Sequence, residues 1–98
     1  MNQQDKIEIS NGVAEKYGID ASVEVTDIVG GTYTIWLADD DARCFRLFID
    51  KHLLIDSNGS FATASGDGAS VIAYAEDHRD KYEAARVAIL KCLEGMKG

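Results

Sequence analysis

Residues 22–64 contain short runs in which apolar and polar residues alternate, and turn-forming residues separate the runs. A period of two is typical of strands that bury one face, whereas a helix repeats its apolar positions every three or four residues. The runs at 32–37 and 44–49 are the clearest, and the acidic residues 39–41 between them fit a hairpin turn. This stretch therefore predicts an antiparallel sheet whose strands are joined by hairpins.

The pairing of the predicted strands follows from the requirement that one face of the sheet be apolar throughout. A three-residue loop at 29–31 pairs Val25 with Ile35. A later loop brings Ile55 opposite Phe61. The predicted inner face consists of Val23, Val25, Tyr33, Ile35, Leu37, Phe45, Leu47, Ile49, Leu53, Ile55 and Phe61.

Helices are predicted at both ends of the chain. Residues 3–17 favour a helix, and Gly18 stands where a glycine C-cap is common. Residues 78–94 carry apolar side chains at helical spacing, with Asp77 as the N-cap. The segment 69–76 is either a last strand or the start of this helix, and we favour the strand because a continuous helix would be about 37 Å long. The apolar stripe of the last helix comprises Tyr82, Ala85, Ile89, Cys92, Leu93 and Met96.

These elements predict an α+β fold: an antiparallel sheet of four to five strands with an N-terminal and a C-terminal helix packed on one face (α-β-β-β-β-β-α). The 98 residues are expected to form one domain, 1–98, because two halves would each be too small to bury a core. The helix–three-strand–helix order is similar to that of double-stranded-RNA-binding domains. The basic helix start that contacts phosphate in that family is acidic here, so the resemblance implies topology and not function.

Acidic residues outnumber basic ones by 17 to 10, which gives a formal net charge of −7. Such a chain repels phosphate backbones and anionic membrane surfaces. It lacks an apolar stretch of the roughly 18 residues that a membrane span needs, and residues 1–5 do not resemble a signal peptide. We therefore expect a cytoplasmic protein that binds neither nucleic acid nor membrane, with reduced thiols at Cys44 and Cys92.

The sequence carries no recognisable motif for catalysis, metal binding or cofactor binding. The acidic run 39–41 does not continue into the glycine and glutamate positions of a calcium loop, and the glycine-rich residues 65–70 lack the lysine of a phosphate-binding loop. The soft metal ligands lie too far apart in the sequence for a zinc site. We therefore predict no catalytic, cofactor-binding or metal-binding residues, which leaves an enzymatic role open but disfavoured. These soft ligands are Cys44, His52, His78 and Cys92.

The outer face of the predicted sheet carries large side chains that need a covering surface. A tryptophan with an arginine beside it is the composition of a protein-interaction hot spot, and Arg46 is expected to stack on Trp36. Either a partner covers this face, or a terminal segment of the chain folds over it as a second small core. The predicted partner-binding residues are Trp36, Phe48, Arg46 and Cys44.

Three functions are compatible with these observations. The first is a non-catalytic protein-interaction domain that binds a protein partner or itself, with a homodimer as the simplest form. The second is an acidic inhibitor or nucleic-acid mimic from a mobile element that occupies a basic groove of a partner protein. The third is a small enzyme or ligand-binding domain that uses Cys44 with His52 or His78. We favour the first, because catalytic motifs are missing and the predicted outer face carries large side chains around Trp36.

Overall fold

The computed structural model describes residues 1–97, which form three α-helices and two antiparallel sheets. One sheet pairs β1 with β2, and the other has the strand order β3-β4-β5. In chain order the elements are α1 (Gln3–Tyr17), β1 (Ser22–Thr26), β2 (Thr32–Trp36), the 3-10 turn η1 (Leu37–Asp39), α2 (Asp41–Asp50), β3 (Leu54–Ser57), β4 (Phe61–Gly66), β5 (Ala69–Tyr74), the 3-10 turn η2 (Ala75–Asp77) and α3 (Lys81–Gly95).

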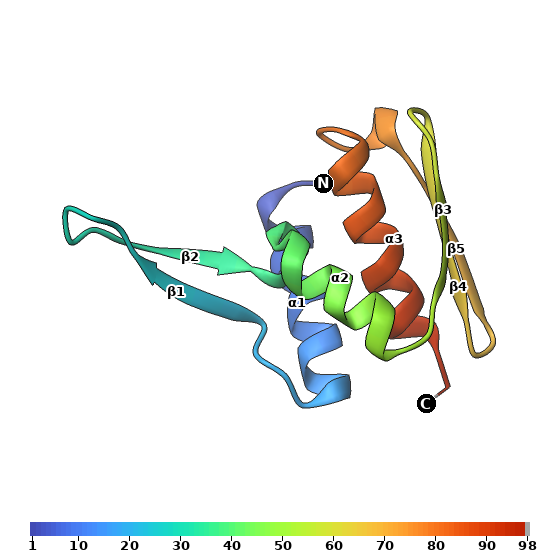
Figure 1. Ribbon diagram of the computed structural model, residues 1–98, viewed down its shortest axis with the longest axis horizontal. Coiled ribbons are helices and arrows are strands. Elements are labelled where there is room, and N and C mark those ends of the chain that lie inside the picture. The colour runs from blue at the N-terminus through green and yellow to red at the C-terminus, as the bar shows by residue number, and fades with distance from the viewer. Residues whose placement is uncertain (98) are drawn as a thin grey trace.

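Helix α3 lies at the centre of the helix and sheet layers (Figure 1). Strands β4 and β5 cover one side of it, and α1 and α2 pack against the other. Ala62, Ala64 and Ala73 are buried in the core that the sheet forms with α3, and such short side chains let a helix lie close to a sheet. On α3 itself, Val87 and Leu90 have no exposed surface. The core is therefore arranged around α3.

The three-stranded sheet has a register that differs from the prediction. Ala64, and not Phe61, lies opposite Ile55, so the predicted pairing is wrong by three positions. An odd shift turns every side chain of a strand to the opposite face. Phe61 accordingly packs edge-on against Tyr74 of the neighbouring strand, with 6.3 Å between the ring centroids, while the alanines of β4 face the core. The prediction followed the larger side chain, whereas the buried face of β4 is made of small ones.

The predicted third strand, at 44–49, is wrong, because this segment lies within α2. The side chain of Asp40 accepts a hydrogen bond from the N–H of Arg43 (3.1 Å) and caps the helix. The acidic run therefore starts a helix and does not close a hairpin. Cys44 and Leu47 are buried three positions apart, which is a helical spacing, and the intervening residues of α2 lie towards solvent.

Strands β1 and β2 form a separate hairpin that extends away from the helices (Figure 1). Val25 pairs with Tyr33 rather than with Ile35, because the loop spans five residues, 27–31, instead of three. This error of two positions leaves the faces unchanged. Val23 and Val25 therefore share one face with Tyr33 and Ile35, as predicted.

Both terminal helices are confirmed. Helix α1 spans the predicted residues and ends at Gly18, whose left-handed backbone (φ 66°) is that of a glycine C-cap. Helix α3 begins later than predicted, because Asp80 rather than Asp77 is its N-cap. The Asp80 carboxylate accepts a hydrogen bond from the N–H of Glu83 at 2.8 Å.

The α+β class is confirmed, but the predicted single sheet of four to five strands is wrong, since the strands divide into two sheets. Helix α3 lies on the three-stranded sheet, whereas α1 packs on the far side of α3 instead of beside it. The segment 69–76 forms β5 and then η2, which agrees with the strand that we favoured. None of the helices in the described part of the chain combines the length and apolar character that a membrane crossing requires.

Candidate functional site

The β1–β2 hairpin with its loop, called here the arm, ends in two exposed aliphatic side chains. Ile28 is fully exposed and Val29 is 86 % exposed. The carboxylate of Asp27 accepts hydrogen bonds from the N–H groups of Val29 (3.1 Å) and Gly31 (2.8 Å). These bonds hold the loop in one shape. The arm therefore presents apolar surface to water on a loop that its own hydrogen bonds order.

One face of the arm is apolar and only partly covered. Val23 and Val25 are half-buried, and Tyr33 is exposed. On the polar face, the hydroxyl of Thr34 donates a hydrogen bond to the carboxylate of Glu24 (2.8 Å). A hairpin of two strands is marginally stable in water unless something packs on its apolar face. The arm therefore has an apolar face that the described residues cover only in part.

An apolar groove with a volume of about 530 Å³ lies between α2 and α3 and is called here the α2–α3 groove. Phe45 of α2 and Tyr82 of α3 line it and remain 61 % and 59 % exposed, whereas Ile89 lines it from a buried position. Pockets of roughly 300–1,000 Å³ are large enough to bury a small ligand or several side chains. The groove is thus an apolar surface that the fold of a single chain leaves uncovered.

A buried arginine lines the same groove. Arg86 is 6 % exposed; its Nε donates to the carbonyl of Ala38 (2.8 Å), and its Nη1 pairs with the carboxylate of Asp41 (2.7 Å). Its Nη2 is buried and has no hydrogen-bond partner among the described residues. An unsatisfied buried donor costs roughly 1–3 kcal/mol. Arg86 is therefore a buried cation at the wall of an otherwise apolar groove, and one of its donors is left unsatisfied by the described residues.

No protein-family model, curated protein or solved structure matches this chain. Its function must therefore be inferred from the surfaces that folding leaves exposed. Besides the arm and the α2–α3 groove, the outer face of the three-stranded sheet exposes Leu54, Ile72 and Tyr74, and Phe61 packs against Tyr74 on this face. Polar side chains, Thr63 and Ser65, separate Leu54 from Ile72, whereas Ile72, Tyr74 and Phe61 are neighbours on the sheet. The arm differs from this sheet cluster because it projects from the body, and the α2–α3 groove differs because it is concave.

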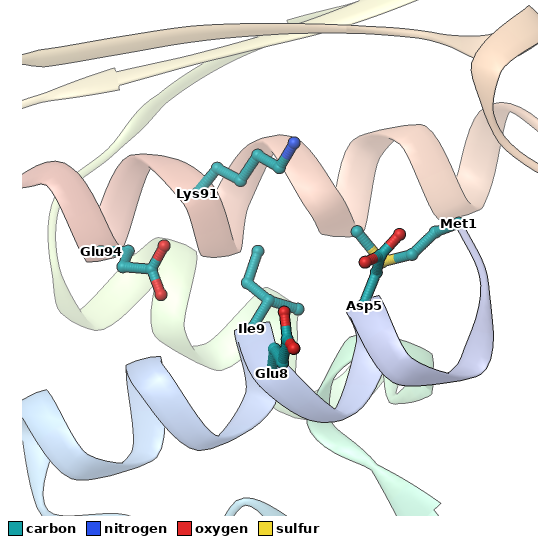
Figure 2. Close-up of a pocket in the computed structure, with 6 residues that line it drawn as sticks. All are labelled: Met1, Asp5, Glu8, Ile9, Lys91 and Glu94. Atoms are coloured by element: carbon teal, nitrogen blue, oxygen red, sulfur yellow. The ribbon is translucent and has the colours of Figure 1, made fainter.

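A second hollow, of about 370 Å³, lies between α1 and α3 and is polar. Figure 2 shows Asp5 and Glu8 of α1 and Glu94 of α3 along it, together with Lys91. A side chain at Gly12 would overlap the Glu94 carboxylate, so this glycine lets the carboxylate lie between the two helices. Within residues 1–97, none of these charged groups is both buried and without a partner. We therefore regard the hollow as solvated surface.

The four residues predicted to bind a partner do not share one sheet face, because α2 replaces the predicted strand. Trp36 ends β2 at the base of the arm and is half-buried. Arg46 is exposed on α2, and Phe48 is half-buried against the core. Cys44 is 1 % exposed and offers no surface to a partner.

The Cys44 thiol is in an environment that suppresses its reactivity. It donates a hydrogen bond to the carbonyl of Leu37 (3.2 Å). Among the described residues, neither His52 nor His78 is a hydrogen-bond partner of this thiol. Burial raises the pKa of Cys44 to about 12, against a smaller lowering by Arg86. A thiol that stays protonated at neutral pH is a poor nucleophile. The hypothesis of a cysteine–histidine enzyme therefore gains no support from this geometry.

A buried carboxylate fixes the start of α3. Glu83 accepts hydrogen bonds from the N–H of Arg79 (3.2 Å) and from the amino group of Met1 (3.1 Å), and the Nζ of Lys6 lies 3.6 Å away. Burial alone would raise the pKa of Glu83, but these partners outweigh it and hold the pKa at about 2. The charged carboxylate thus links α1 to the part of α3 that lines the groove.

The arm tip and the α2–α3 groove were not predicted as binding surfaces. A signal for the tip exists at Ile28 and Val29, since two aliphatic residues stand in a turn segment where polar residues are usual. Phe45 carried no such signal, because it was assigned to the inner face of a strand. Tyr82 was likewise assigned to the buried stripe of the last helix. Both side chains are exposed once α2 is a helix and α3 is central.

Proposed function

We propose that this chain is a non-catalytic protein-interaction domain that self-associates, and that the arm is the element that makes the contact. One observation carries the proposal: Ile28 and Val29 stand fully or largely exposed at the end of a hairpin that projects from the body. Exposed apolar surface on a projecting element is typical of association sites.

The shape of the arm tip supports the same proposal. The Asp27 carboxylate restrains the loop through the N–H groups of Val29 and Gly31. A loop that is already ordered loses little conformational entropy on binding, which favours association. The partly covered apolar face behind the tip extends the surface that a partner can bury.

The residues predicted from the sequence enter this proposal unequally. Trp36 is the last residue of β2, so it lies at the base of the arm and stays a proposed contact. Arg46 and Phe48 lie on α2, as secondary contacts of the same partner. Cys44 is left out of the proposed contact because it is buried.

The test is the solution mass of the reduced protein, measured by sedimentation and light scattering over a range of concentrations. We expect the wild type to exceed the monomer mass of 10.7 kDa. The double variant Ile28→Asp/Val29→Asp should remain monomeric, because two carboxylates replace the apolar tip. Leu54→Asp/Ile72→Asp adds the same charge at exposed sheet positions and should assemble like the wild type. A wild type that is monomeric at every concentration, or an arm variant that assembles unchanged, contradicts the proposal.

A further inference from the structure

We infer that the arm tip of one copy binds in the α2–α3 groove of a second copy. This inference rests on the proposed function and names the surface that receives the arm. It joins the projecting apolar tip and the apolar groove in one contact between different surfaces, rather than pairing two arms with each other.

The chemistry of the two surfaces is complementary. The tip offers the aliphatic side chains of Ile28 and Val29, and the groove offers the aromatic walls Phe45 and Tyr82 above the buried Ile89. A volume of about 530 Å³ has room for two aliphatic side chains and the loop that carries them. The contact removes the exposed apolar area of both surfaces from water, and this burial favours association.

The arm does not fill the groove of its own chain. The hairpin extends away from the helices, and the groove lies between two of those helices (Figure 1). The molecule is 43 Å in its longest dimension. An arm held in this orientation therefore meets a groove only on another copy.

The groove is also lined by one basic side chain, Arg86. The buried Nη2 of Arg86 lacks a hydrogen-bond partner among the described residues. The carbonyl groups of Ile28 and Val29 accept none of the hydrogen bonds that close the loop, since those bonds end on Asp27 and Gly31. An inserted tip therefore brings free carbonyl acceptors beside an arginine that lines the groove, which an arm-to-arm contact does not do.

The inference is tested by complementation between two variants that are each defective at one surface. Ile28→Asp/Val29→Asp has a defective arm and an intact groove, and Phe45→Asp/Tyr82→Asp has the reverse. Each variant alone should associate at least about tenfold more weakly than the wild type. An equimolar mixture should recover a one-to-one complex, because an intact arm then meets an intact groove. Sedimentation of the separate and mixed proteins measures both effects.

The control is Leu54→Asp/Ile72→Asp, which adds two carboxylates to another exposed surface. It should associate like the wild type, because its arm and its groove are both intact. Circular dichroism and thermal melting check that each variant is folded. If the groove double variant does not fold, Tyr82→Asp alone, at an exposed position, replaces it in the same assay.

The outcomes separate the two claims. If the groove variant associates like the wild type, or if the mixture of defective variants stays monomeric, the arm-to-groove contact is wrong while self-association through the arm stands. If the wild type does not associate, or the arm variant associates unchanged, the proposed function itself is wrong.

Discussion

At the scale of single residues, α3 carries two charged groups inside the protein, and each is held by another segment. Glu83 is held by Lys6 of α1, and Arg86 by Asp41 at the start of α2. A buried charge that loses its partner destabilises a protein far more than an exposed one does. These two residues therefore fix the positions of α1 and α2 on α3, and with them the shape of the α2–α3 groove.

We expect Glu83→Gln to lower the free energy of unfolding by about 1–3 kcal/mol at neutral pH. The pKa of Glu83 is about 2 in the folded protein and about 4.3 in an unfolded chain. Because the folded pKa is the lower one, the stabilisation is complete above the unfolded pKa and is lost as the pH falls towards about 2. Urea denaturation near neutral pH and near pH ~3 should show the gap between variant and wild type shrinking in acid.

The matched control is Glu8→Gln, which removes an exposed carboxylate from α1. Its effect on stability should be small at both pH values. A Glu83→Gln effect that stays constant between neutral and acidic pH would show that the charge of Glu83 is not what stabilises the start of α3.

We expect both cysteines to resist alkylation in the folded protein. Burial raises the pKa of Cys44 to about 12 and raises the pKa of Cys92 as well. Since the thiolate is the reactive form, modification by iodoacetamide at neutral pH should be slower than in urea by at least about a hundredfold. Mass spectrometry at timed intervals measures the two rates. A thiol that reacts in the native protein as fast as in urea would revive the cysteine-based enzyme hypothesis.

At the scale of elements, prediction from the sequence succeeded where local and tertiary preferences agree. Helix α1 was predicted with its bounds, because helix-favouring residues are followed by Gly18 as a C-cap. The arm was predicted as a hairpin with the correct faces, because Val23 and Val25 alternate with polar residues. In both cases short-range signals are sufficient.

Prediction from the sequence failed where the order of apolar residues is compatible with both a strand and a helix, or where burial depends on a distant element. In α2, the apolar residues satisfy strand alternation, yet Cys44 and Leu47 also have helical spacing, and packing against α3 selects the helix. In β4, the inner face consists of Ala62 and Ala64, whose burial depends on how closely α3 approaches. The α2–α3 groove could not be predicted, because it exists only once both helices are placed.

We expect Asp40→Ala to lower the free energy of unfolding by about 1 kcal/mol, because it removes the N-cap of α2. Asp50→Ala, at the opposite end of the same helix, is the control. It should have little effect or stabilise slightly, since a negative charge is unfavourable near a helix C-terminus. Urea denaturation followed by circular dichroism measures both. Equal effects of the two substitutions would contradict the capping role of Asp40.

At the scale of the whole molecule, the net charge of −7 opposes any contact between two copies. The proposed contact is apolar, so charge repulsion weakens it without providing its driving force. In the alternative function, an acidic inhibitor or nucleic-acid mimic, charge has the opposite effect, because the negative charge itself attracts the basic partner protein.

The two functions are therefore distinguished by salt. We expect self-association to become tighter between about 0.05 M and about 1 M salt, because salt screens the repulsion and leaves the apolar contact intact. Sedimentation of the wild type at several salt concentrations measures this. Binding to a basic partner protein would weaken over the same range, and self-association that weakens with salt would contradict an apolar contact.

The central position of α3 also determines when the protein can fold during synthesis. Strands β4 and β5 and helices α1 and α2 all pack against α3, which is the last of these elements to be made. While the ribosome is still adding residues 81–95, the sides of β4, β5, α1 and α2 that pack on α3 in the folded protein lack that partner. The part of the core that these segments share with α3 can therefore close only after residues 81–95 have been made.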